Sequence, residues 1–180
     1  MALPFDEDIL IEHLRDHKTR RAAFSDVVKA YSEPLYWHIR RMVLNHDDAN
    51  DLLQNTFIKA WTGIDGFLGN SKMLTWLYRI ATNETITFLN RTNTVVIEEP
   101  ETCATQLEAD TYFDGDSLQT RLQEAIQTLP PKQRMVFNMK YYDDMKYEEI
   151  SSILGTSIGA LKASYHLAVK KISSFFDDDI

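Results

Sequence analysis

The sequence has one cysteine, five prolines and six glycines in 180 residues, and each scarcity excludes a class of protein. A single cysteine, Cys103, cannot form an intramolecular disulfide, so we expect a cytoplasmic protein. Few turn-forming residues beside many Leu, Ala, Ile, Glu and Lys favour helices over short strands. No apolar run approaches the roughly 18 residues that a bilayer span requires, and the acidic N-terminus, with Asp6, Glu7 and Asp8, does not have the pattern of a secretory signal. We therefore expect a helical protein without membrane insertion.

Motifs of covalent chemistry are also missing from the sequence. There is no phosphate-binding Walker loop, no dinucleotide-binding glycine fingerprint and no nucleophile elbow. His13 and His17 have the i, i+4 spacing of metal ligands, but no third ligand follows, so we predict a solvated helix face there. We expect neither an enzyme nor a bound cofactor or metal.

The net charge of −8 is distributed unevenly. Residues 92–120 hold seven acids and no base, and Asp177, Asp178 and Asp179 form an acidic tail. Residues 21–91 carry a net charge of +1 and residues 121–176 a net charge of +3. The segments expected to fold are therefore neutral to mildly basic, and the overall acidity does not exclude a nucleic-acid partner.

Apolar residues recur at helical spacing in two parts of the chain, separated by an acidic stretch. The first part runs from Ile9 to Arg91 and is interrupted by Gly63, Gly66 and Gly69; the second begins at Leu122. We predict an all-α protein with two small helical domains, residues 1–91 and 121–176. A flexible acidic linker, 92–120, joins them, and 177–180 is an acidic tail.

The end of the second part has the pattern of a helix-turn-helix. Gly155 suits the left-handed end of a first helix, and Thr156-Ser157 suits the N-cap of the next. Small residues on the second helix would allow close approach to base edges, and its lysines would neutralise phosphates. Any helical hairpin gives a similar apolar pattern, so DNA binding stays open at this point. The face expected to meet DNA comprises Ser157, Gly159, Ala160, Lys162, Ala163, His166 and Lys170.

Several motifs, in one order, resemble the extracytoplasmic-function sigma factors of bacterial RNA polymerase. The segment D-D-A-N-D-L-L-Q-N-T-F, residues 47–57, followed by Ala60-Trp61, is similar to the family's region 2.2. T-W-L-Y-R-I-A-T-N, residues 75–83, is similar to region 2.3 and the start of region 2.4. L-P-P-K-Q-R, residues 129–134, resembles the start of region 4, and residues 147–171 resemble its helix-turn-helix.

The resemblance implies a docking site on the clamp helices of the polymerase largest subunit. An apolar anchor surrounded by carboxamides and a carboxylate suits a helix-on-helix interface. Phe57 and Trp61 share an apolar face with Leu53, so core packing is the favoured interpretation for these two aromatics. The residues at the family's docking positions are Asp51, Gln54, Asn55, Phe57 and Trp61.

The resemblance also implies contacts with melted promoter DNA. The loop Gly63–Met73 matches the segment that receives a flipped base, although an ordinary glycine-rich turn is the alternative. Phe67, Asn70, Ser71 and Lys72 offer stacking, hydrogen bonds and a phosphate contact there. Arg79, Asn83 and Thr87 share one polar helix face, and Asn83 matches the family's Asn beside the flipped base.

Two departures from the family pattern weaken these contacts. Three arginine positions of the family's recognition helix are Ser164, Leu167 and Val169 here, so we expect fewer phosphate contacts and lower unaided DNA affinity. Asn50 and Asn55 stand where the family often has Glu, which reduces the charge of region 2.2.

The predicted function is a transcription initiation factor that binds core RNA polymerase through its clamp helices and flap. The first domain would recognise and melt the −10 element, and the helix-turn-helix would read the −35 element of promoter DNA. A stand-alone helix-turn-helix regulator and a helical adaptor without a DNA role are the alternatives. The resemblance further implies an anti-sigma factor partner, often membrane-anchored in this family.

Overall fold

The computed structural model describes residues 6–43, 45–67, 69, 71–95 and 117–177. All secondary structure within these residues is helical, which confirms the predicted all-α fold. The chain divides into two compact units, Met1–Phe88 and Leu89–Ile180.

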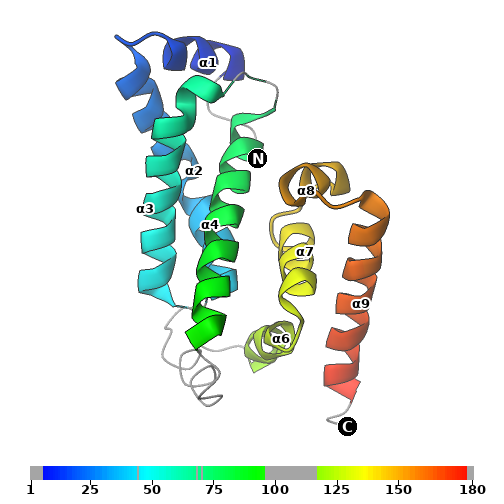
Figure 1. The fold of residues 1–180 in the computed structure, drawn as a ribbon. Helices are drawn as coiled ribbons and strands as arrows, with labels where there is room; N and C mark the ends of the chain where they lie inside the picture. Colours follow the sequence, from blue (N-terminus) through cyan, green and yellow to red (C-terminus); the bar gives the residue numbers. More distant parts are fainter. Residues whose placement is uncertain (1–5, 44, 68, 70, 96–116, 178–180) are drawn as a thin grey trace. The chain divides into compact units, whose positions relative to one another are not determined.

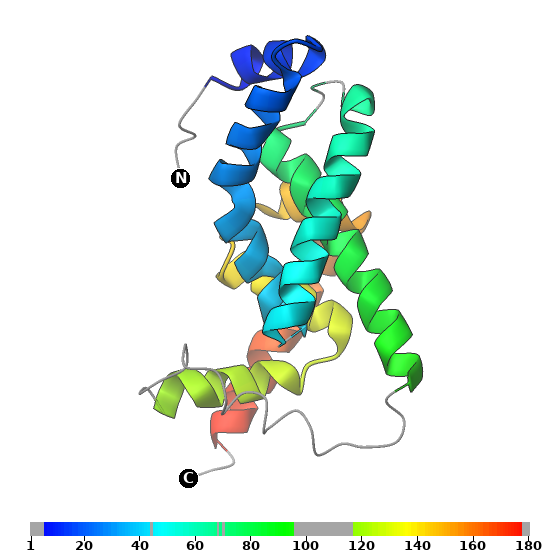
Figure 2. The same ribbon diagram turned by 90° about the vertical axis from the view of Figure 1, so that its left-hand side faces the viewer.

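The first unit is a bundle of three long helices with a short helix across one end (Figure 1). Figure 2 shows the three long helices side by side from a second direction. The short helix is α1 (Glu7–Arg15), and the long ones are α2 (Arg20–Val43), α3 (His46–Gly63) and α4 (Met73–Val95); a 3₁₀ turn, η1 (Ile64–Gly66), follows α3.

Apolar side chains at helical spacing build the core of this bundle. Val27, Leu35 and Ile39 of α2 are fully buried, as are Met73 and Leu77 of α4. Pro34 lies inside α2 without ending it.

Polar contacts fix the position of α4 against its neighbours. The Nε2 atom of the buried His38 ring of α2 lies 3.0 Å from the hydroxyl oxygen of Thr82 in α4. The same ring packs edge-on against Tyr78, with ring centroids 4.9 Å apart. Lys59 of α3 donates to the Glu84 carboxylate of α4 at 2.5 Å. The outward face of α4 is therefore held in one orientation relative to α3.

The second unit contains α6 (Ser117–Gln127), α7 (Pro131–Tyr141), α8 (Tyr147–Leu154) and α9 (Ile158–Asp177). Pro131 begins α7, where its missing N–H costs nothing. The long helix α9 packs against all three others. The core of the second unit comprises Ala125, Ile126, Leu129, Phe137, Ala168 and Ile172.

Helices extend further into the predicted linker than composition indicated. α4 continues to Val95, and α6 begins at Ser117, so both ends of the expected 92–120 segment are helical. Thr and Asn residues at the end of α4 have weak helix propensity, which the preceding helix overrides. Most of the linker, residues 96–116, lies outside the described residues, as do residues 178–180 of the tail.

Candidate functional site

α3 has one buried face and one exposed face. The Asn45 side chain caps the helix by accepting hydrogen bonds from the N–H groups of Asp47 (2.7 Å) and Asp48 (3.2 Å). Ala49, Leu52, Thr56 and Ala60 then turn inward. The predicted docking residues Asp51, Gln54 and Asn55 are exposed on the opposite side.

Ile58 continues this exposed face, and sequence reasoning did not identify it. Its side chain is 60% exposed, and it follows Asp51, Gln54 and Asn55 at positions i+7, i+4 and i+3. The helical period was the available signal, because it places residue 58 on the same side as 51, 54 and 55. The α3 outer face, defined as Asp51, Gln54, Asn55 and Ile58, thus has an apolar centre with a polar surround.

The two aromatics predicted at the docking site differ in their placement. Phe57 is buried, with 9% exposure, and meets Phe24 edge-on at 6.4 Å, so it supports the α3 outer face from beneath. Trp61 is 41% exposed, although its ring packs 5.1 Å from Phe24. The favoured core interpretation fits Phe57 but not Trp61, which lines a shallow groove with Arg21, Phe24 and Ser25.

The loop after α3 is anchored by its apolar residues. Ile64 and Phe67 are buried, and the Phe67 ring lies against Trp76 with centroids 4.9 Å apart. Phe67 was predicted to offer a stacking surface, but at 7% exposure its ring is mostly covered, because an apolar side chain in a short loop gains more from packing on the bundle. Lys72 is exposed and Ser71 half-buried, while Asn70 lies outside the described residues.

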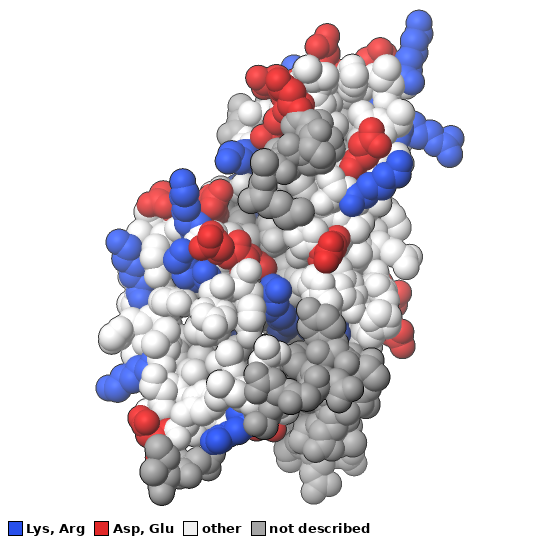
Figure 3. Space-filling view, turned by 180° about the vertical axis from the view of Figure 1, so that it is seen from behind, with Lys and Arg blue, Asp and Glu red and all other residues white. Residues whose placement is uncertain are grey.

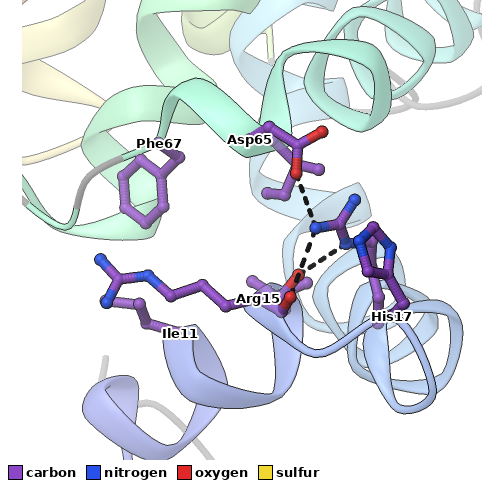
Figure 4. A pocket seen from close by; sticks show the side chains of 8 residues that line it. Ile11, Arg15, His17, Asp65 and Phe67 are labelled. Carbon is purple, nitrogen blue, oxygen red and sulfur yellow. Dashed lines mark hydrogen bonds and ion pairs between the residues drawn. The ribbon is translucent and has the colours of Figure 1, made fainter.

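α1 and the first residue of α2 hold the two ends of this loop. The Glu7 carboxylate accepts a hydrogen bond from the backbone N–H of Met73, the first residue of α4. Arg20 forms an ion pair with Asp65 at 2.6 Å, and its Nε donates to the Leu14 carbonyl at 2.7 Å (Figure 4). The short N-terminal helix and the start of α2 therefore anchor the loop between α3 and α4 at its two ends.

The polar face predicted on α4 is exposed in the structure. Arg79, Asn83 and Thr87 point away from the bundle, one turn apart. The Thr87 hydroxyl donates to the backbone carbonyl of Asn83 at 2.8 Å. The Asn83 side chain is exposed, and its amide carries both donors and an acceptor. Glu84, paired with Lys59, lies directly beside Asn83 in sequence and is largely shielded.

α8 and α9 form a helix-turn-helix. Gly155 ends α8 in the left-handed conformation with φ of +63°, as its position predicted. The Ser157 hydroxyl accepts a hydrogen bond from the Ala160 N–H at 3.4 Å at the start of α9. All seven residues predicted to meet DNA, from Ser157 to Lys170, are exposed.

Aromatic contacts orient one lysine of this face. The Lys162 ammonium lies 5.7 Å from the centre of the Tyr147 ring, and Lys140 lies at the same distance. A phosphate would meet Lys162 already positioned by this cation–π contact.

The remainder of the α9 surface is less basic. Leu167 and Val169, which replace arginines of the resembled pattern, are 47% and 39% exposed. The absence of arginine charges at these two positions favours weak unaided DNA binding. Figure 3 draws one face of the chain as a whole, on which basic and acidic side chains are interspersed.

Two kinds of site are missing from the described part of the chain. It holds no group of three His, Cys, Asp or Glu side chains suited to a metal ion. Across residues 6–95 and 117–177, with the gaps given above, no helix has the length and apolar character needed to cross a membrane.

Comparison with known proteins gives one consistent result. Residues 27–94 match the family Sigma-70 region 2, and residues 119–172 match Sigma-70, region 4. The chain is 35% identical to the ECF RNA polymerase sigma factor SigW of Bacillus subtilis over 156 residues, covering 80% of this chain and 83% of that protein. It is 27% identical to the ECF RNA polymerase sigma-E factor of Salmonella typhimurium, covering 97% and 96% of the two chains.

Two solved structures share the fold. CnrH, in complex with the cytosolic domain of CnrY, has a TM-score of 0.72 at 22% identity and covers 97% of this chain and 99% of its own. The sigma factor RpoE of Bartonella quintana, in complex with the anti-sigma factor NepR, has a TM-score of 0.67 at 20% identity, covering 87% and 98%.

Proposed function

The chain belongs to the extracytoplasmic-function group of the sigma-70 family. On this basis we propose that separate exposed surfaces of the chain bind RNA polymerase and the two promoter elements. Sigma factors are transcription initiation factors and not enzymes, and this chain directs RNA polymerase to promoters through regions 2 and 4. The observation that supports this assignment is that α3 and α4 each present an exposed face of their own.

The α3 outer face docks on the clamp helices of the polymerase largest subunit. Ile58 supplies an apolar centre, while Gln54 and Asn55 supply hydrogen bonds at its edge, an arrangement typical of interface hot spots. Trp61 extends the apolar area at one end. Phe57 contributes by holding the helix in place from the core.

The exposed face of α4 and the preceding loop engage the melted −10 element. Asn83 presents an amide that reads a base edge with both a donor and an acceptor, and Arg79 and Lys72 supply positive charge for the strand. Energy for holding the flipped base comes from these contacts and from no covalent step.

The second unit reads the −35 element with α9 and contacts the polymerase flap. Gly159, Ala160 and Ala163 allow close approach to the major groove, and Lys162 meets a phosphate. Few basic residues surround them, so specific binding requires polymerase. An anti-sigma factor, expected to be membrane-anchored, is proposed as the inhibitor, and the complex with polymerase forms in the cytoplasm.

Run-off transcription with the cognate core polymerase and a genomic promoter library tests this division. Asn83→Ala and Lys162→Glu should each reduce promoter-dependent product by about tenfold or more while core binding is retained. Lys29→Glu is the charge-reversal control, because Lys29 is exposed on α2, outside the helices that carry Asn83 and Lys162. Tight specific DNA binding without polymerase would favour a stand-alone regulator, and indifference to both substitutions would favour an adaptor.

A further inference from the structure

A shallow groove of about 470 Å³ lies where the start of α2 runs beside the end of α3. Figure 2 shows these two helices side by side. Arg21, Phe24 and Ser25 of α2 line the groove together with Trp61 of α3. The side chains of Arg21, Ser25 and Trp61 are exposed, so the groove is open to a partner. Its volume is large enough to take an apolar side chain of that partner.

The groove continues the α3 outer face at one end. Trp61 follows Ile58 at position i+3 and Gln54 at position i+7, so these three residues lie along one side of α3. Ile58 is 60% exposed and Trp61 is 41% exposed, which gives this side two accessible apolar side chains. The ring of Phe24 packs against Trp61 with centroids 5.1 Å apart and holds it beside the groove.

Opposite charges stand at the two ends of this surface. Asp51 is the one charged residue of the α3 outer face, and Arg21 is the one charged residue that lines the groove. Among the described residues, no carboxylate is in ion-pair contact with Arg21. Asp51 and Trp61 are ten positions apart in α3, which corresponds to about 15 Å along the helix axis. An acid and a base therefore face a partner about 15 Å apart, with apolar side chains between them.

The α2 side of the groove precedes the part of the chain that the family pattern covers. The match to Sigma-70 region 2 begins at residue 27, after Arg21, Phe24 and Ser25. A contact made by Arg21 would thus be added to those that the region 2 motifs imply.

We propose that this groove is a second docking point for the polymerase clamp, and that Arg21 sets the direction in which a clamp helix lies along α3. An acidic residue of that helix pairs with Arg21, and a neighbouring apolar side chain packs on Trp61. A basic residue of the same helix meets Asp51, about ten residues away. A reversed helix would bring like charges together at both ends, which disfavours that orientation. This inference rests on the proposed function, because the clamp helices are the partner of the α3 outer face.

The first test measures the affinity of the full chain for core polymerase. Arg21→Glu should weaken binding by about tenfold or more, because it places a second acid opposite the acid of the clamp. Lys29→Glu is the matched control: it makes a similar charge reversal in the same helix, but Lys29 does not line the groove. Circular dichroism during thermal unfolding checks that both variants are folded.

The second test exchanges charges across the interface. Each acid of the clamp helices is replaced by Arg and each base by Glu, and every polymerase variant is combined with Arg21→Glu and with Asp51→Arg. One acid-to-Arg change should restore most of the affinity lost in Arg21→Glu, and one base-to-Glu change should do so for Asp51→Arg. The two restoring positions should lie about ten residues apart on one helix.

A photo-crosslinking residue placed at Ser25 locates the partner of the groove without changing either charge. It should attach to the clamp beside the position that restores Arg21→Glu. A crosslink to another part of polymerase overturns the proposal.

Distinct failures separate the groove from the proposed function. Equal core affinity of Arg21→Glu and Lys29→Glu, with Ile58→Glu still defective, overturns the role of Arg21 alone. A loss in Arg21→Glu that no clamp change restores overturns the pairing with a clamp acid. Unchanged core affinity together with lost binding of the anti-sigma factor overturns it in favour of an inhibitor site. If neither Arg21→Glu nor Ile58→Glu weakens core binding, the proposed docking of α3 on polymerase fails as well.

Discussion

Replacing Glu7 by alanine measures how strongly α1 holds α4 and the loop before it. The Glu7 carboxylate accepts the N–H of Met73, one of the four N–H groups that a helix leaves without an internal partner. Loss of such a cap costs about 1 kcal/mol. Glu7 also lies in the first turn of α1, where a carboxylate contributes a further ~0.3–1 kcal/mol through the helix dipole.

Asp8→Ala is the control that separates these two contributions. Asp8 lies in the same first turn of α1 and is exposed, so its removal changes the dipole contribution only. The free energy of unfolding of Glu7→Ala should be about 1 kcal/mol lower than that of Asp8→Ala. This corresponds to a melting temperature lower by roughly 4–8 °C for a unit of this size. All three tryptophans, Trp37, Trp61 and Trp76, belong to the first unit, so their fluorescence follows its unfolding without interference from the second.

A second readout comes from Tyr31. Burial, and then the nearby Glu7 carboxylate, raise the pKa of Tyr31 from 10.0 to about 12. Glu7→Ala should lower the pKa of Tyr31 part of the way toward 10.0, as ultraviolet absorbance during alkaline titration would measure, whereas Asp8→Ala should not. Equal melting temperatures for the two variants, with an unchanged tyrosine titration, would refute the capping role.

Three further outcomes follow from the structure. Ile58→Glu should weaken core polymerase binding by about tenfold or more without changing thermal stability, because Ile58 is 60% exposed; unchanged affinity in a pull-down titration would remove it from the interface. Gly155→Ala should destabilise the second unit by about 1–2 kcal/mol, seen as a lower-melting transition in circular dichroism, because φ of +63° strains an alanine. Burial, then Asp51 and Asp47, raise the pKa of Asp48 above 3.8, so the folded chain holds that proton more tightly than the unfolded chain. The wild type should therefore lose stability relative to Asp48→Asn as pH rises from 3.8 through the raised pKa; denaturation curves showing a pH-independent difference would contradict this.

The helical faces were predictable because the 3.6-residue period is a property of the sequence itself. It placed Asp51, Gln54 and Asn55 on one side of α3, and the structure exposes all three. The left-handed Gly155 after α8 was also predictable from the sequence. It lies between two stretches of apolar residues at helical spacing, which only a short turn can join.

Side chains outside a regular period were harder to place. Phe67 lies in a glycine-punctuated loop, so nothing local indicates whether its ring packs inward or outward. Ile58 and Trp61 are apolar residues on the outside, and hydrophobicity alone assigns such residues to the core. The anchoring of the loop by Glu7 and Arg20 depends on residues 66 and 45 positions away from their partners, which only the fold brings together.

The ion pair between Lys59 and Glu84 joins the helix proposed to bind polymerase to the helix proposed to bind DNA. Lys59 follows Ile58 in α3, and Glu84 follows Asn83 in α4, so each charged residue is the immediate neighbour of a contact residue. A movement of α3 on docking would act on α4 through this ion pair, next to Asn83. Thermodynamic linkage requires the reverse effect of equal size: a promoter that fits α4 strengthens the hold on polymerase by the same factor by which polymerase strengthens the hold on that promoter. Specificity for the right promoter would then appear as a longer lifetime of the whole complex.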